Sequence, residues 1–363
     1  MSDPVRISFM PGLELCRRFY EQVVRPLFDT HFPQLQYAAA RIGAGSDVLG
    51  FDTPMSTDHD WGPAVTIFLL EQDQHLFSAI DAVLAQHLPA SFLDVPVLVP
   101  RGAQAPGETR ESVHRVMLTT LRRFVQAQFA HNIDQPLAPA DWLTISAQKL
   151  RECTAGAAFH DATGELSTFR QGLAWYPDDV WRYLLAAGWQ RIGQEEHLMS
   201  RAGFVGDEQG SALIGSRLVR DIMQLCFLIE RQYPPYPKWF GSAFAQLQCQ
   251  PDLAPLLDAA QFARRWPERA SALGLCYEQT LHLHNQLGIT PPITAHLTNF
   301  FNRPFPVIFG STIAEAIAAT IVDPEVQRIA ARPLIGSIDQ WSDSTDLRSD
   351  PSWRARLRSL YED

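Results

Sequence analysis

The sequence predicts an α+β protein in which an N-terminal mixed β-sheet with flanking helices is followed by a C-terminal helical domain. Apolar segments of strand length alternate with helical patterns as far as about residue 131, and the patterns beyond are helical. The proline-containing stretch 135–140 separates the two parts. We therefore predict one domain over residues 1–135 and a second over residues 141–363.

The first half of the N-terminal domain is predicted to contain two helices and two strands. Residues 10–30 carry apolar side chains at helical spacing, and residues 37–42 read as a strand that leads into a Gly-Ser turn. A second apolar strand covers residues 65–70. The helical pattern of residues 74–88 ends at Pro89, which cannot continue a helix.

The second half of this domain is predicted to contain two more strands and a short helix. Residues 93–99 read as a strand at the edge of the sheet, because Pro96 removes a backbone donor. A further strand is predicted over residues 114–121. A short helix is predicted over residues 122–131.

The C-terminal domain is predicted to be helical throughout. Pro177 precedes a long amphipathic pattern, as proline commonly does at a helix start. The predicted helices cover residues 178–201, 211–231, 253–287 and 311–331.

Composition indicates a globular protein of the cytoplasm. The chain has 363 residues, of which 46% are hydrophobic and 19% charged, enough for two domains with cores of their own. No apolar run has the length of a membrane span, and the N-terminus lacks the pattern of a secretory signal. Five scattered cysteines predict reduced, buried thiols rather than a disulfide framework or a zinc site.

Charge disfavours nucleic acid as a partner. The formal net charge is −10, and no segment gathers Lys and Arg along one face, as a protein that grips a phosphate backbone would. A small-molecule acceptor is therefore favoured over a polymer. Long-range attraction would favour a cationic acceptor, such as an aminoglycoside.

The most informative motif lies between Gly45 and Asp60. A Gly-Ser turn, Gly45 and Ser46, is followed after a short connection by Asp58 and Asp60. On an extended segment these two carboxylates share one face, where they would hold one hard cation, while the turn offers amides and a hydroxyl to phosphate oxygens. The alternative is a surface loop whose aspartates cap turns. The apolar strand that follows favours the site.

Gly-Ser, a linker and Asp-x-Asp together resemble the active-site signature of the nucleotidyltransferase superfamily, which includes polymerase beta and the aminoglycoside nucleotidyltransferases. More narrowly, the chain resembles an uncharacterised bacterial domain-of-unknown-function family that is described as nucleotidyltransferase-like. The segments that carry this second resemblance are Gly45–Pro63, Asp141–Leu143, Phe159–Leu166, Tyr176-Pro177 with Trp181, and Tyr236–Phe240.

The resemblance implies a chemistry class. A nucleoside triphosphate would donate its nucleoside monophosphate group to a hydroxyl acceptor, with Mg²⁺, or else Mn²⁺, held by Asp58 and Asp60. Members of the superfamily usually add a third carboxylate from a later strand, but residues 113–120 contain no acid. Asp94 or Glu111 would have to replace it. If neither does, the chain is a catalytically weak nucleotide-binding regulatory or antitoxin-like protein.

Three residues of the helical domain complete the predicted site. Glu195 is the candidate general base, since antibiotic nucleotidyltransferases draw their base from this domain; the alternative is a buried partner for an arginine. Arg217 is predicted to bind the triphosphate with Asp221 orienting it, or to form a buried ion pair with that residue. Lys238, in an aromatic and proline-rich segment, is predicted to bind phosphate, with a cation–π contact as the alternative.

Overall fold

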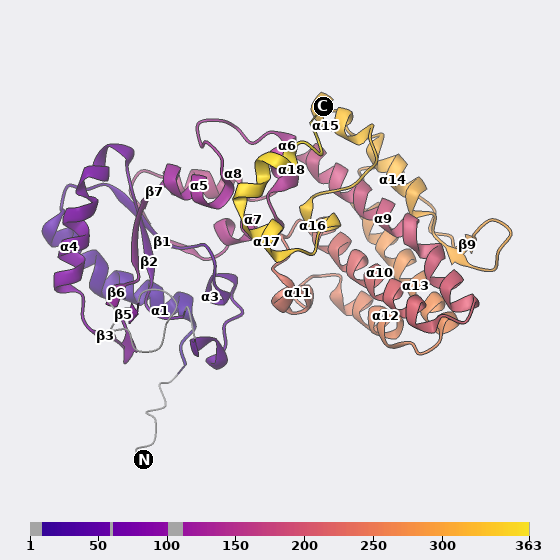
Figure 1. Ribbon diagram of the computed structural model, residues 1–363, viewed down its shortest axis with the longest axis horizontal. Helices are drawn as coiled ribbons and strands as arrows, with labels where there is room; N and C mark the ends of the chain where they lie inside the picture. Colours follow the sequence, from indigo (N-terminus) through magenta and orange to yellow (C-terminus); the bar gives the residue numbers. More distant parts are fainter. Residues whose placement is uncertain (1–8, 59–60, 101–111, 363) are drawn as a thin grey trace, which may run out of the picture. The chain divides into compact units, whose positions relative to one another are not determined.

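The computed structural model describes residues 9–58, 61–100 and 112–362, apart from the side chains of residues 58, 100 and 112. The chain forms two compact units (Figure 1). The first comprises residues 1–136 and 149–174, and the second comprises residues 137–148 and 175–363. The protein is α+β, with a small mixed sheet in the first unit and mainly helices in the second, as the sequence predicts.

A four-stranded sheet forms the centre of the first unit, in the order β7, β2, β1, β8. Its strands are β1 Tyr37–Arg41, β2 Val65–Leu69, β7 Val116–Thr120 and β8 Ala157–Asp161. Strand β1 is antiparallel to both of its neighbours, with Ala39 opposite Ile67. Strands β2 and β7 are parallel, with Val65 opposite Val116. The sheet is therefore mixed.

Alternation along β2 buries both faces of this sheet. Ile67 packs in a core with Phe19 and Leu84, whereas its neighbour Phe68 meets Phe124, with ring centroids 5.3 Å apart. The helices of the first face are α1 Gly12–Phe19, α2 Arg25–His31 and α4 Phe77–His87, with a π-helical turn, Tyr20–Val24, joining α1 to α2. The aromatic contacts of the second face involve α5 Leu121–Phe129 and α8 Glu165–Gly172.

The predicted edge strand over residues 93–99 is wrong at its start. Leu93 and Asp94 have φ angles of 49° and 64°, and they form a turn between two very short strands, β3 Ser91–Phe92 and β4 Val95–Pro96. Two residues with positive φ close a tight hairpin, which apolar content does not reveal. A second short pair follows, β5 Leu98–Pro100 with β6 Ser112–His114.

The chain returns to the first unit after it has entered the second. Strand β8 pairs with β1, with Ala38 opposite Asp161, so residues 149–174 belong to the first unit. The division into residues 1–135 and 141–363 places this segment in the helical domain instead. The sequence does not predict this strand, because β8 is only five residues long and lies between two helices.

Long helices form the body of the second unit. The largest, α9 Asp178–Phe204, packs against α10 Glu208–Ile229 and α14 Gly310–Ala318 (Figure 1). Gly193 and Gly310 allow the close approach of α9 and α14, since a Cβ on Gly193 would meet Ser311. Within the residues that the structure describes, no helix combines the length and apolar composition that crossing a bilayer requires. The other α-helices of this unit are α6 Pro139–Thr144, α11 Pro237–Phe244, α12 Gln250–Phe262, α13 Trp266–Gln286, α15 Pro324–Ala330, α16 Ile338–Trp341, α17 Thr345–Ser349 and α18 Arg354–Arg358, and its short strands are β9 Thr298–Asn299 and β10 Pro306–Val307. Helix α7 Ala147–Thr154 lies mostly in the first unit.

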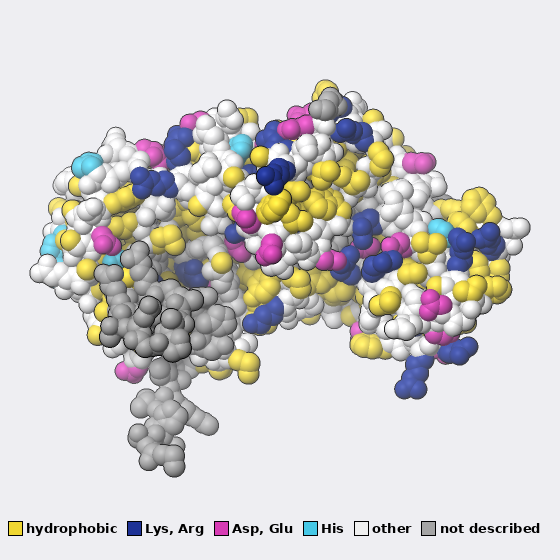
Figure 2. All heavy atoms as spheres, in the orientation of Figure 1, with side chains coloured by type: hydrophobic (Ala, Val, Ile, Leu, Met, Phe, Trp, Pro, Cys, Tyr) yellow, Lys and Arg dark blue, Asp and Glu magenta, His cyan; other side chains and the backbone are white. Residues whose placement is uncertain are grey.

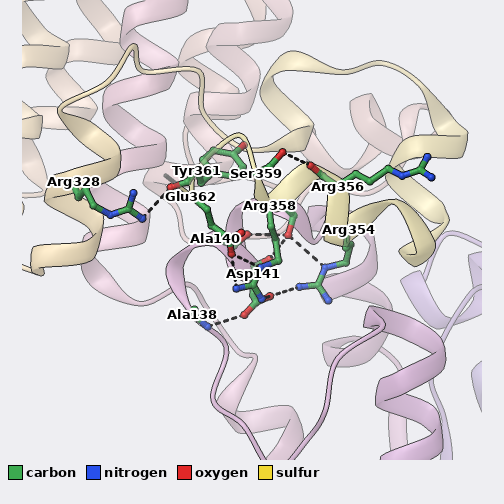
Figure 3. Close-up of polar contacts among 11 residues, drawn as sticks. Ala138, Ala140, Asp141, Arg328, Arg354, Arg356, Arg358, Ser359, Tyr361 and Glu362 are labelled. Atoms are coloured by element: carbon green, nitrogen blue, oxygen red, sulfur yellow. Dashed lines mark hydrogen bonds and ion pairs between the residues drawn. The ribbon is translucent and has the colours of Figure 1, made fainter.

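A buried carboxylate attaches the C-terminal helix α18 to α6. Figure 3 shows Asp141 facing Arg354 and Arg358, whose nitrogens lie 2.8 and 2.7 Å from its Oδ1. Its Oδ2 accepts the backbone N–H of Ala138 at 3.0 Å. Because two guanidinium groups and one amide surround this carboxylate, Asp141 has a structural role in the second unit.

Candidate functional site

The Gly-Ser turn follows β1 directly and opens a short helix, α3 Ser46–Leu49. Gly45 has a φ of 146°, a value that residues with a side chain rarely adopt. There is also no room for a side chain, because a Cβ at Gly45 would collide with Asp47 and with the guanidinium of Arg41. The turn therefore requires glycine at this position. Gly50, with a φ of 74°, ends the helix.

An ion pair holds the two ends of this turn together. Arg41 Nε donates to Asp47 Oδ2 at 2.7 Å, and Arg41 Nη2 donates to Asp47 Oδ1 at 2.8 Å. The two side chains are only 14% and 5% exposed. Because this bidentate ion pair is largely shielded from solvent, it holds the backbone of Gly45 and Ser46 in place.

The two predicted metal ligands fall on the part of the chain that is least described. Asp60 lies outside the described residues, as does the side chain of Asp58. The backbone of Asp58 ends a 3-10 helix, Pro54–Asp58, and β2 begins only at Val65. The expected extended conformation is thus wrong at Asp58, because its segment coils into a helical turn.

Contacts on both sides of residues 59–60 hold this connection against α1. Asp52 Oδ2 accepts the backbone N–H of Gly12 at 2.6 Å and the indole N–H of Trp61 at 3.3 Å. The Cys16 thiol donates to the carbonyl oxygen of Gly62 at 3.4 Å, and burial raises the pKa of this thiol to about 11. Asp52 and Cys16 therefore have structural roles, and Cys16 stays protonated.

The structure does not place either predicted substitute for the third carboxylate, Asp94 or Glu111, beside the predicted metal ligands. Asp94 is an exposed residue of the β3–β4 turn, and Glu111 lies outside the described residues. The basic residue Arg115 lies instead beside the segment that leads into β2. Its carbonyl accepts the N–H of Val65 at 3.2 Å, and its Nη1 lies 3.5 Å from the position of a Cβ on Gly62.

The sequence interpretation overlooked Arg115. The signal was its charge, since Arg115 lies with His114 between Val113 and Val116 in a predicted strand.

In the second unit the structure brings Glu195 and Arg217 together. Arg217 Nη2 lies 2.8 Å from Glu195 Oε1, and Arg217 Nε donates to Glu195 Oε2 at 2.9 Å. The Glu195 side chain is 22% exposed and that of Arg217 is 50% exposed. The pair is therefore partly open to solvent and joins α9 to α10.

The next residue, Glu196, is the more deeply buried acid. Its carboxylate accepts the backbone N–H groups of Ile308 at 2.6 Å and Gly310 at 3.0 Å. Burial raises the pKa of Glu196 to about 7, although these hydrogen bonds oppose the shift. The sequence prediction named Glu195 rather than Glu196, because local sequence does not show which of two neighbouring acids is enclosed.

The expectation that Asp221 orients Arg217 is wrong. Asp221 pairs instead with Arg191, at 3.2 Å, and lies 3.7 Å from Arg220. Burial raises the pKa of Asp221, and its side chain is 1% exposed. The spacing of residues 217 and 221 places them on one face of α10, but each side chain reaches a different neighbour.

Lys238 lies at the start of α11 and is exposed. Its Nζ is 4.8 Å from the ring centroid of Trp239, which is the cation–π alternative raised by the sequence. Such a contact leaves ammonium donors available to solvent or to an anion.

Comparisons with known proteins place the chain near an uncharacterised family. Residues 142–240 match the profile of a family described as "Domain of unknown function (DUF4037)". The matched range includes Glu195, Arg217 and Lys238 but not the segment Gly45–Asp60. No curated protein matches the chain.

One solved structure that resembles the chain is described as a nucleotidyltransferase-like protein from Exiguobacterium sibiricum. Its sequence is 12% identical, and the alignment covers 94% of this chain and 89% of the other. The TM-score is 0.34, which is too low to support a shared fold or function.

Proposed function

We propose that this protein is a metal-dependent nucleotidyltransferase that moves a nucleoside monophosphate group from a nucleoside triphosphate to a hydroxyl group. The observation that carries the proposal is the Gly45–Ser46 turn at the end of β1, the strand that pairs with β2. The segment with Asp58 and Asp60 precedes β2 in the chain, so the turn follows one strand and the acidic residues come before its neighbour. Gly-Ser followed by Asp-x-Asp in this order is the pattern that nucleotidyltransferases share.

The donor set for a divalent cation is the pair of carboxylates of Asp58 and Asp60. The neighbouring acids are already engaged, Asp47 by Arg41 and Asp52 by Gly12 and Trp61. Two carboxylates suit Mg²⁺, which commonly keeps other positions for water and substrate phosphates. When bound, the cation would neutralise charge that develops on the phosphate oxygens.

The remaining proposed roles belong to side chains and backbone of this chain. The amide of Ser46 and its hydroxyl bind phosphate oxygens at the glycine turn, and Arg217 and Lys238 provide positive charge for the triphosphate. The acceptor oxygen bonds to the α-phosphorus as the bond from that phosphorus to pyrophosphate breaks. The hydroxyl proton passes to the carboxylate of Glu195.

A small-molecule acceptor fits the charge of the protein better than a polymer. On the face in Figure 2, the described Lys and Arg side chains are scattered among acidic and apolar ones. A nucleic acid partner would call for a continuous basic track. The net charge of −10 supports the same choice.

Release of pyrophosphate from labelled triphosphates tests the proposal. The protein is incubated with each triphosphate, Mg²⁺ and a panel of hydroxyl acceptors that includes the protein itself and RNA. We expect release that falls at least 100-fold in Asp58→Asn and Asp60→Asn, the size of effect seen when a group that stabilises transition-state charge is lost. Asp258→Asn, at an exposed position of α12, is the matched control and should leave the rate unchanged. Equal rates in all four proteins would refute the proposal.

The second candidate is a nucleotide-binding regulatory or antitoxin-like protein with little or no turnover. Arg115 favours it, because a guanidinium rather than a third carboxylate lies beside the segment leading into β2. An arginine there can bind a phosphate but cannot ligate a cation. Triphosphate binding without pyrophosphate release, unchanged by any acceptor, would support this candidate.

A further inference from the structure

The second unit contains a partly open cavity of about 150 Å³ that the proposed transfer reaction does not use. Its walls come from α9, α10, α11 and α16, and from the segment that precedes α9. All of its lining residues belong to the second unit. An engineered protein cavity of ~150 Å³ holds a benzene molecule, so the space suits a small ring compound.

The lining is predominantly apolar, and aromatic rings form part of it. Trp175, Tyr176 and Phe240 contribute to the wall, and prolines at positions 234, 235 and 237 stiffen the segment next to them. Trp175 and Tyr176 lie with ring centroids 5.0 Å apart and planes at 72°. Flat surfaces held rigidly in this way favour a flat ligand.

Charge at the cavity is already balanced. Arg220 donates to both carboxylate oxygens of Asp343, at 2.7 and 2.8 Å, and Arg348 donates to Asp339 at 2.6 Å. Each guanidinium therefore has its own carboxylate, and an added anion would meet Asp339 and Asp343 as well as the arginines. This balance favours an uncharged ligand over a phosphate or a carboxylate.

We propose that this cavity binds an uncharged aromatic compound of one or two rings, held by contact with the aromatic wall. The aromatic wall accounts for the flat ring, and the paired arginines account for the absence of charge. The proposal does not depend on nucleotidyl transfer.

Ligand-observed NMR and calorimetry on the full chain test this site, without triphosphate or metal. The probes are adenine, cytosine and benzimidazole, with benzoate as a charged ring and cyclohexanol as a ring that is not aromatic. We expect at least one of the three heteroaromatic probes to bind, and benzoate and cyclohexanol to bind at least tenfold more weakly.

Two variants connect binding to this cavity. Trp175→Phe replaces the indole of the wall with a smaller ring, and we expect about threefold to tenfold weaker binding, because contact area with the ligand is lost. Phe240→Leu keeps an apolar wall but removes the ring, and it serves equally if the first variant does not fold. Trp353→Phe, at an exposed position of the same unit, should bind as the unchanged protein does.

The proposal is overturned if no heteroaromatic probe binds at millimolar concentration, which would leave the cavity to water. It is also overturned if benzoate binds most tightly, or if Trp175→Phe and Phe240→Leu both bind as well as Trp353→Phe does.

Discussion

Arg41 and Asp47 form a bidentate ion pair across the Gly-Ser turn, with Nε to Oδ2 at 2.7 Å and Nη2 to Oδ1 at 2.8 Å. The pair leaves no space for a side chain on Gly45, whose φ of 146° already favours glycine. The conformation of the turn therefore depends on residues on both sides of the dipeptide.

Gly45→Ala should lower the free energy of unfolding by about 2 kcal/mol, because the new methyl group combines backbone strain with a collision against Arg41 and Asp47. Urea unfolding measures the change. Gly172→Ala is the matched control in the same unit, since a Cβ there meets nothing within 4 Å, and it should shift stability by less than about 1 kcal/mol. Equal effects of the two substitutions would contradict this view of the turn.

Arg354→Met should destabilise the protein by about 3 kcal/mol, because it removes one of two arginines from the buried carboxylate of Asp141. Arg356→Met alters an exposed residue of the same helix and should cost less than about 1 kcal/mol. Thermal unfolding of both variants provides the comparison. A smaller loss for Arg354→Met than for Arg356→Met would contradict the assigned role of Asp141.

Glu196 should make stability depend on pH between about 4.5 and 7. Burial raises the pKa of Glu196 in the folded protein to about 7 from a usual value of 4.5. The folded state then binds more protons than the unfolded state in this window, so the free energy of unfolding falls as pH rises and levels off above pH 7. The contribution is of the order of 3 kcal/mol.

Glu196→Gln tests this dependence. The advantage of the unchanged protein over the variant should shrink by about 2 to 3 kcal/mol from pH 4.5 to pH 8, measured by urea unfolding. Glu315→Gln, an exposed position on α14, is the control and should follow the unchanged protein at every pH. An advantage that is constant over this range would show that folding does not raise the pKa of Glu196.

Glu195→Gln should lower kcat for pyrophosphate release by about 10² to 10⁴, the usual contribution of a general base, with little change in KM for the triphosphate. Steady-state kinetics with saturating acceptor measure both constants. A structural role for the Glu195–Arg217 ion pair would instead lower the melting temperature and leave kcat close to its original value. Glu315→Gln again serves as the control.

Several elements follow from the sequence because their signals are local. Strands β1 and β2 are continuous apolar runs, and the long helices α9 and α10 carry apolar residues at helical spacing. Neighbouring residues alone define both kinds of signal. The Gly-Ser dipeptide at positions 45 and 46 is likewise a local signal, because it follows an apolar strand and predicts a turn. These features predict the fold class and the location of the Gly-Ser turn.

Other features depend on residues that are far apart in the sequence. Strand β8 joins the sheet through β1, more than a hundred residues earlier, so no local pattern assigns it to the first unit. Glu195 and Glu196 are adjacent on α9, yet only Glu196 is enclosed, by the backbone of residues 308–310. Burial, and with it pairing and pKa, is set by the segments that pack around a residue. The sequence therefore determined the local elements and the motif, and the tertiary structure decided which charged groups are paired, enclosed or exposed.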